Sequence, residues 1–232
     1  MNTLAFDTCF GACSVAATWS TPEGRAGAFR FERMARGHAE RLIPMVGEAM
    51  ADAPFGFSEI ARIVVTTGPG TFTGQRVGIA AARSLSLATG APIAPLSSLA
   101  VMAYTAAYEL GSELQGKLLA VAVDARRDEI YFQAFSGADW IALDVPALLT
   151  PGSAVRALTK RDVVAVGSGA VLLAEAARHA GVSITPRLAT LEPDVRFVPE
   201  AAVLPSDTPP KPLYLRPPDA KPQDGKSLAR VP

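Results

Sequence analysis

The sequence predicts two similar α/β domains, each a mixed sheet flanked by helices. Two observations predict this fold class. First, β-prone runs alternate with helical patterns over the first 110 residues or so. Second, an apolar run that ends in aspartate, then a turn, then another β-prone run occurs twice, in LAFDTCFGACSVAAT and in KLLAVAVDARRDEIYFQAF. This repeat favours an internal duplication, although aspartate also occurs at hairpin turns for a local reason, because its side chain bonds turn amides.

The first elements are a predicted hairpin and a helix. Residues 3–7 and 13–19 are β-prone runs joined by a glycine-containing turn, and a third strand is expected around residues 27–31. Residues 38–52 have helical spacing. The apolar stripe of that helix consists of Leu42, Met45, Val46, Ala49 and Met50.

The stretch GPGTFTGQRVG, residues 68–78, follows a short β-branched run and opens a helix that reaches residue 88. Thr71 can cap this helix. One interpretation is an anion site at the helix N-terminus, but the Lys-Ser/Thr ending of a Walker loop and the GxGxxG spacing are both missing. The interpretation that the residues favour is close helix packing, because Gly74, Gly78 and Ala82 recur every four residues on one stripe.

The second half of the chain repeats the alternation. A short strand and a helix that Ser97 or Ser98 could cap occupy residues 91–110, and the polar residues 111–116 are a reasonable domain boundary. A strand at residues 162–166 leads through Gly167-Ser168-Gly169 to a helix that ends near residue 181. These glycines suit either a nucleotide lying against the backbone or a tight turn without a ligand.

Proline density sets the expected domain limits. From residue 185 onward it rises, and such a segment cannot sustain a helix. The exception is LYLR, residues 213–216, where alternation predicts an extended segment docked on the body. We therefore expect one domain at residues 1–110, a second at residues 111–216, and a disordered tail at residues 217–232.

Composition excludes several classes of protein. The 232 residues carry 22 basic and 22 acidic side chains, so no overall field attracts RNA. The N-terminus is not of the signal-peptide type and no apolar run reaches membrane-spanning length, so we expect a cytoplasmic protein without a membrane partner. Cys9 and Cys13 are expected to be small buried residues. His38 lacks a second histidine at ligand spacing, which favours a hydrogen-bonded structural residue over a metal site.

Three motifs in one order identify a family resemblance: DT near residue 7, GPGTFTGQRVG, and VDARRDEIYFQAF. The chain resembles the bacterial TsaB family, also called YeaZ, over residues 1–135, and again at VGSGA and PLYLR. Two departures stand out. Gln75 replaces a residue that is usually aliphatic, and the helix expected between residues 197 and 210 is shortened and interrupted by prolines.

The resemblance implies a fold of the actin, Hsp70 and sugar-kinase type. The turn that holds Asp7 and Thr8 and the turn after Asp124 would correspond to the two phosphate-binding hairpins, and Gly167 and Gly169 to the adenosine loop. In this family these places are generally degenerate, so no catalytic residue, metal or cofactor is expected on this chain alone. ATP or ADP is expected, if anywhere, in the complex with TsaD and TsaE.

The resemblance also implies a function and partners. The chain would be a non-catalytic scaffold for its homologue TsaD, which transfers threonylcarbamoyl to adenosine 37 of tRNAs reading ANN codons. The ATPase TsaE would join the pair, tRNA would bind only through the complex, and the chain alone would form a homodimer. The alternatives are a nucleotide-dependent phosphotransferase and a peptidase acting on the partner.

A hypothesis for the partner surface follows from the two helical stripes, because exposed apolar surface is costly. The expected interface residues are His38, Leu42, Met45, Ala49, Thr71, Gly74, Gln75, Gly78 and Ala82. On this hypothesis, Gly78→Leu abolishes binding of TsaD and leaves the monomer folded.

Overall fold

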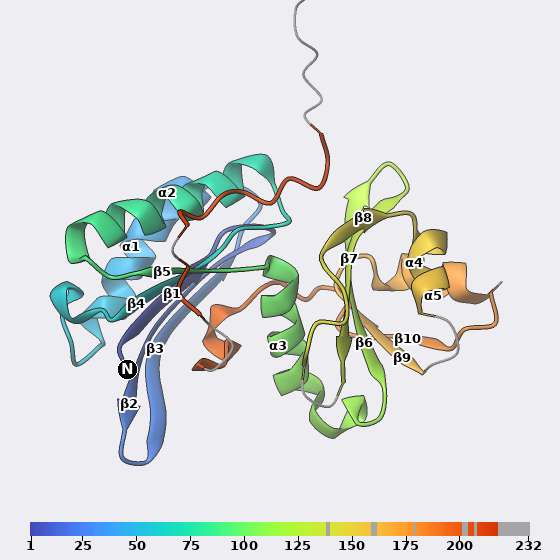
Figure 1. The fold of residues 1–232 in the computed structure, drawn as a ribbon, viewed down its shortest axis with the longest axis horizontal. Helices are drawn as coiled ribbons and strands as arrows, with labels where there is room; N and C mark the ends of the chain where they lie inside the picture. The colour runs from blue at the N-terminus through green and yellow to red at the C-terminus, as the bar shows by residue number, and fades with distance from the viewer. Residues whose placement is uncertain (138–139, 159–161, 179, 201–203, 207, 218–232) are drawn as a thin grey trace, which may run out of the picture.

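Two five-stranded mixed sheets form the protein (Figure 1). The computed structural model describes residues 1–137, 140–158, 162–178, 180–200, 204–206 and 208–217. The strand order is β3-β2-β1-β4-β5 in the first sheet and β8-β7-β6-β9-β10 in the second. In each sheet the central strand pairs antiparallel with the next strand in sequence and parallel with the fourth. The predicted fold class, two α/β domains on one plan, is confirmed.

The first sheet contains the predicted N-terminal hairpin. Its strands are β1 (Thr3–Asp7), β2 (Ala12–Thr21), β3 (Gly24–Arg33), β4 (Arg62–Thr66) and β5 (Ile93–Leu96). Helices α1 (His38–Ala51) and α2 (Phe72–Thr89) lie side by side on one face of the sheet (Figure 1). The alternate residues Leu4, Phe6 and Val15 point to these helices and form a core with Leu42 and Met45.

The second sheet repeats this arrangement with shorter elements. Its strands are β6 (Leu118–Arg126), β7 (Glu129–Ser136), β8 (Ala147–Leu149), β9 (Val163–Val166) and β10 (Ile184–Pro186). Helices α4 (Pro151–Ala157) and α5 (Ala170–Arg178) cover one face and enclose Ala120, Ile130 and Phe132. The sequence had not predicted β8, α4 or β10.

Helix α3 (Ser98–Leu110) lies between the two sheets (Figure 1). Val101 packs on the first sheet, beside the 3-10 helix η3 (Val195–Phe197), while Leu99 and Met102 pack on the second. Two further 3-10 helices are η1 (Phe57–Glu59) and η2 (Gly111–Leu114). Since α3 contacts both sheets, the boundary between residues 110 and 111 stays a prediction.

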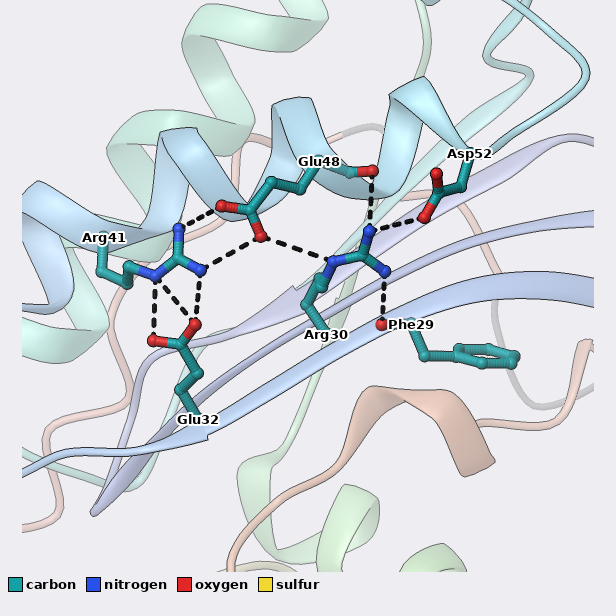
Figure 2. Close-up of polar contacts among 6 residues, drawn as sticks. All are labelled: Phe29, Arg30, Glu32, Arg41, Glu48 and Asp52. Atoms are coloured by element: carbon teal, nitrogen blue, oxygen red, sulfur yellow. Dashed lines mark hydrogen bonds and ion pairs between the residues drawn. The ribbon is translucent and has the colours of Figure 1, made fainter.

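A network of ion pairs joins the flank of α1 to the face of β3 that the helix covers (Figure 2). Arg41 bonds the carboxylates of Glu32 and Glu48, with 2.6 Å between its Nη1 and Glu48 Oε1. Arg30 lies 2.5 Å from Asp52 Oδ2 and 3.4 Å from Glu48 Oε2. The Arg41 guanidinium lowers the pKa of both glutamates. The network therefore holds the side of α1 that bears Arg41 and Glu48 against strand β3.

The predicted caps are confirmed. The Thr71 hydroxyl accepts the Gly74 N–H at 3.0 Å at the start of α2, and the Ser97 hydroxyl accepts the Leu99 N–H at 3.1 Å at the start of α3. Of the predicted tail, residues 218–232 lie outside the described residues, as do parts of the segment 197–210. None of the described helices is long and apolar enough to cross a membrane.

Candidate functional site

The turn between β1 and β2 is the first of the two hairpin turns that the family resemblance singled out, along with the adenosine loop. Asp7 is fully buried at the end of β1. Its Oδ1 accepts the Thr66 hydroxyl at 2.5 Å and its Oδ2 accepts the Cys9 N–H at 3.2 Å. Burial raises the pKa of Asp7 from 3.8 to about 7, against the lowering effect of these hydrogen bonds. The carboxyl is thus held within the protein and faces no open cleft.

The GPGTFTGQRVG segment covers this turn from one side. The Thr71 N–H donates to the Cys9 carbonyl at 2.8 Å, and the Thr8 hydroxyl donates to the Gly74 carbonyl at 2.7 Å. A Cβ on Gly74 would clash with the Thr8 carbonyl oxygen, and a Cβ on Gly78 would lie 2.8 Å from Thr8 Oγ1. The predicted close approach of another backbone is therefore correct, but that backbone belongs to the chain's own first turn.

The other side of the turn is closed by the second half of the chain. The ring of Phe10 lies 6.2 Å from that of Tyr131 on β7. The Gly11 N–H donates to Glu192 Oε2 at 2.9 Å, so an internal carboxylate holds an amide of the turn. Burial raises the pKa of Glu192, and the Gly11 amide, Arg33 and His38 oppose this shift. His38 Nε2 lies 3.0 Å from the Phe10 carbonyl, which is the structural role predicted for it.

The second turn, between β6 and β7, is held by the C-terminal segment. Arg126, Arg127 and Asp128 have φ values of 63°, 57° and 57°, so three successive side-chain-bearing residues are left-handed. Arg216 Nη1 donates to the Ala125 carbonyl at 2.9 Å, and Arg216 Nη2 lies 2.5 Å from Glu129 Oε2. The guanidinium of Arg216 thus occupies the inside of this turn.

Asp124 lies next to this turn and beside the predicted adenosine loop. Its N–H donates to the Ser168 hydroxyl at 3.0 Å. A Cβ on Gly167 would lie 3.0 Å from the Met102 side chain, and a Cβ on Gly169 would lie 3.0 Å from Ile130. Both glycines therefore serve tight packing of the strand-to-helix turn against β6 and its neighbours.

The two cysteines are free and buried, as predicted. The Cys9 Sγ lies 3.3 Å from Thr66 Oγ1, and burial raises its pKa well above 9.0. Burial also raises the pKa of Cys13 to about 12. Neither thiol therefore ionises near neutral pH to act as a nucleophile. Within the described part of the chain, no group of three His, Cys, Asp or Glu side chains gathers as metal ligands.

Most of the residues predicted to contact a partner are buried inside the chain, so this prediction is wrong for them. Their burial against the chain's own sheet and first turn takes them out of reach of a partner. The buried ones are His38, Leu42, Met45, Ala49, Gly74, Gln75, Gly78 and Ala82. Thr71 is exposed but is used as the cap of α2. The amphipathic stripe is the side of each helix that folding itself buries.

Gln75 has a structural explanation of its own. Its Nε2 donates to the Gly70 carbonyl at 2.9 Å, and its amide occupies the space that a Cβ on Gly68 would need, 2.7 Å from Gln75 Cδ. Its Oε1 is buried without a hydrogen-bond partner among the described residues. The residue faces the loop, and neither a partner nor solvent.

The exposed side of α1 and α2 is the surface that the sequence reasoning missed. Its uncharged part, which lies among the exposed Glu40 of α1 and the exposed Arg76 and Arg83 of α2, contains two large aliphatic residues, Ile43, 54% exposed, and Leu87, 90% exposed. Its members are Ile43, Pro44, Gly47, Ala51, Thr73, Ala80, Ser84, Leu87 and Ala88, here called the outer face. The signal that could have found it is a pair of aliphatic residues out of phase with the buried stripe.

Comparison with known proteins gives relatives for this arrangement. A family model described as TsaD, tRNA N6-adenosine threonylcarbamoyltransferase, matches residues 25–142, just over half of the chain. The TsaB of Haemophilus influenzae is 36% identical over 132 residues, 57% of this chain and 52% of that protein. The chain thus spans about half the length of this relative. An uncharacterized protein of Mycobacterium tuberculosis is 36% identical over 81% of this chain and 79% of its own length.

Solved structures agree with the sequence relatives. YeaZ from Pseudomonas aeruginosa superposes with a TM-score of 0.72 at 27% identity, over 92% of this chain and all of that one. A second structure, described as an uncharacterized protein with similarity to peptidase YEAZ from Pseudomonas aeruginosa, gives a TM-score of 0.76 at 28% identity over 93% of this chain and 99% of that one. The likeness covers both sheets.

Proposed function

The chain belongs to the TsaB (YeaZ) family, and on this premise we propose that it is a non-catalytic scaffold subunit in the synthesis of threonylcarbamoyladenosine in tRNA. Its partner in this proposal is a TsaD homologue, which carries the chemistry and binds the tRNA and any ATP or ADP. A TsaE-type ATPase joins the pair. Without a partner, the same surface pairs two copies of the chain.

The observation that carries the proposal is the outer face of α1 and α2. Two adjacent helices present mainly small and aliphatic residues to solvent, and the exposed charged residues among them are Glu40 on α1 and Arg76 and Arg83 on α2. Gly47 and Ala80 would let a partner helix approach closely, since nothing lies within 4 Å of a Cβ on Gly47. Such a surface is costly in water and matches the core of a protein interface.

The state of the two turns supports a scaffold over a phosphotransferase. Backbone amides of a phosphate-binding hairpin must face the ligand. Here the Gly11 N–H is bonded to Glu192, Phe10 packs on Tyr131, and Arg216 fills the second turn. For a peptidase, the raised pKa of both thiols and the use of His38 as a hydrogen-bond partner of Phe10 leave no activated nucleophile at this turn.

The test is capture of a TsaD homologue by variants of the outer face. Ile43→Arg places a charge on this face and should weaken the complex at least tenfold, roughly the effect of a strong interface residue. Val171→Arg is the matched control, because Val171 is also an exposed aliphatic residue of a helix, 45% exposed, but lies on α5 in the other half. Gly78→Leu is unsuitable, because the leucine would strike Thr8 and unfold the turn.

Two readouts decide the proposal. The wild-type chain and Val171→Arg should restore threonylcarbamoyladenosine in a strain depleted of its own TsaB, and Ile43→Arg should not. The proposal is wrong if the wild type neither captures the homologue nor restores the modification. ATP turnover by the isolated chain that is lost on Asp7→Ala would favour the phosphotransferase instead, and defined fragments of the homologue after incubation would favour the peptidase.

A further inference from the structure

Two sequence motifs separated by 138 positions meet on the surface beside the outer face. Arg76, from GPGTFTGQRVG, donates its Nε to the hydroxyl of Tyr214, from PLYLR, at 2.7 Å. The ring of Phe72 stacks on that of Tyr214 with centroids 5.7 Å apart and an interplanar angle of 21°. The C-terminal segment runs along α2 to reach this point (Figure 1). We call Phe72, Arg76 and Tyr214 the Arg76 cluster.

The guanidinium of Arg76 is fixed, but the N–H donors of both its terminal NH2 groups are unused. Its Cζ lies 3.6 Å from the centroid of the Phe72 ring, which is close cation–π contact. Its Nε is taken by Tyr214. Within the described residues, neither terminal NH2 group has a hydrogen-bond or ion-pair partner. A planar guanidinium with both ends free can donate two parallel N–H bonds to one oxyanion.

The C-terminal segment holds Tyr214 in place from both sides. The Leu213 N–H donates to the Thr67 carbonyl at 2.7 Å, and Arg216 bonds Ala125 and Glu129 at the second turn. Arg83 Nη2 donates to the Pro210 carbonyl at 2.6 Å further along α2. The side chains of the cluster are therefore ordered before any ligand arrives, which lowers the entropy cost of binding.

We propose that the Arg76 cluster binds a carboxylate of the partner subunit and so extends the outer face to the start of α2. The inference rests on the proposed function. Phe72 is 56% exposed and Tyr214 is 45% exposed, so the cluster offers aromatic surface around one arginine. Tyrosine and arginine are enriched among the few residues that contribute most of the binding energy at protein interfaces.

The surrounding charges favour a protein over RNA as the occupant. Arg126 lies 3.3 Å from Asp124 and Arg216 lies 2.5 Å from Glu129, so these two cations are paired with acids, and Arg83 donates to the Pro210 carbonyl. RNA is usually held by a stripe of unpaired basic residues. The fixed guanidinium of Arg76, with two free NH2 groups beside small and aliphatic residues, fits one carboxylate at the edge of a protein interface.

The test measures the Kd of the complex between the full chain and the TsaD homologue. Arg76→Ala should raise the Kd about 10- to 100-fold, and Arg76→Lys about tenfold, because lysine keeps the charge and loses the two parallel bonds. Tyr214→Phe should raise it about three- to tenfold, since the ring stays and only the hydroxyl that orients Arg76 is lost. Arg126→Ala is the control, a nearby exposed cation outside the cluster, and should change the Kd less than about twofold.

The outcomes separate this inference from the proposed function. If Ile43→Arg abolishes the complex and Arg76→Ala leaves its Kd within about twofold of wild type, the outer face is correct and the Arg76 cluster is not part of it. If the Kd of the protein complex is unchanged but Arg76→Ala weakens tRNA binding by the assembled complex, the occupant is RNA and the carboxylate proposal is wrong. If the wild type binds no homologue at all, the proposed function fails first.

Discussion

The free energy of unfolding should fall as the pH rises from about 4 to about 7, because of the buried carboxyl of Asp7. Burial raises its pKa from 3.8 to about 7 in the folded protein. Between these values the folded state keeps a proton that the unfolded chain releases. The stability that the protonated group provides is therefore complete below about pH 4 and is lost as the pH rises through about 7. A difference of about 3 pH units corresponds to about 4 kcal/mol.

The change that tests this is Asp7→Asn. An asparagine can keep both bonds of Asp7, since its Oδ1 can accept the Cys9 N–H and its Nδ2 can donate to Thr66 Oγ1. It has no charge to bury at any pH. In urea unfolding followed by circular dichroism, the variant should match the wild type within about 1 kcal/mol at about pH 4 and exceed its stability by up to about 4 kcal/mol at about pH 8.

A surface carboxyl provides the control. Asp162→Asn removes an exposed carboxyl just before β9 and should follow the wild-type curve. Glu192, whose pKa is also raised by burial, should leave a smaller slope in the Asp7→Asn protein. If the Asp7→Asn curve has the full wild-type slope, Asp7 is ionised in the folded state and the reasoning from its burial is refuted.

Two further predictions concern packing and surface charge. In a urea melt, Gly74→Ala should lower the free energy of unfolding by about 3 kcal/mol or more, because the added Cβ clashes with the first turn. Gly47→Ala should raise the free energy of unfolding by about 0.5 to 1 kcal/mol, because the Cβ would enter open space and alanine favours helix. If both substitutions change the free energy of unfolding by the same amount, Gly74 is not packed against the first turn as described. Arg41→Met leaves Glu32 and Glu48 without their shared cation, so it should lower Tm in dilute buffer and much less at about 1 M salt, where the Debye length is about 3 Å. A loss of Tm that does not depend on salt would mean that Arg41 acts through packing.

The sequence predicts the elements whose signal is local. The N-terminal hairpin, α1 and the cap at Thr71 follow from alternation, helical spacing and a hydroxyl before a helix, and each is confirmed. The duplication was visible because each half needs the same strand, turn and strand. The missed elements β8 and β10 are three residues each, and α4 is seven residues with a proline at its start. Elements this short depend on neighbours supplied by the rest of the sheet.

The candidate site could be predicted only in part, for a different reason. Periodicity identifies the side of a helix that is most apolar, and that side is buried first, as Leu42 and Met45 show. A partner can contact only the helix residues that stay exposed after folding. In the same way, the spacing of Gly74 and Gly78 correctly predicts a close backbone contact but contains no information on which backbone makes it. That contact links positions about 70 residues apart, and only the fold specifies it.

Each of the two hairpin turns is held by a charged side chain from the C-terminal part of the chain, an acidic one at the first turn and a basic one at the second. In the first turn the Gly11 amide meets the carboxylate of Glu192, and in the second the carbonyl of Ala125 meets the guanidinium of Arg216. Both side chains come from the C-terminal part of the described chain, in which residues 192–200 lie between the sheets and residues 208–217 run along α2 (Figure 1). A hinged enzyme must leave such turns free to open and close on a ligand. Here each turn is tied to a segment that also contacts the other half, so the geometry that presents the outer face and the Arg76 cluster is set within the chain itself.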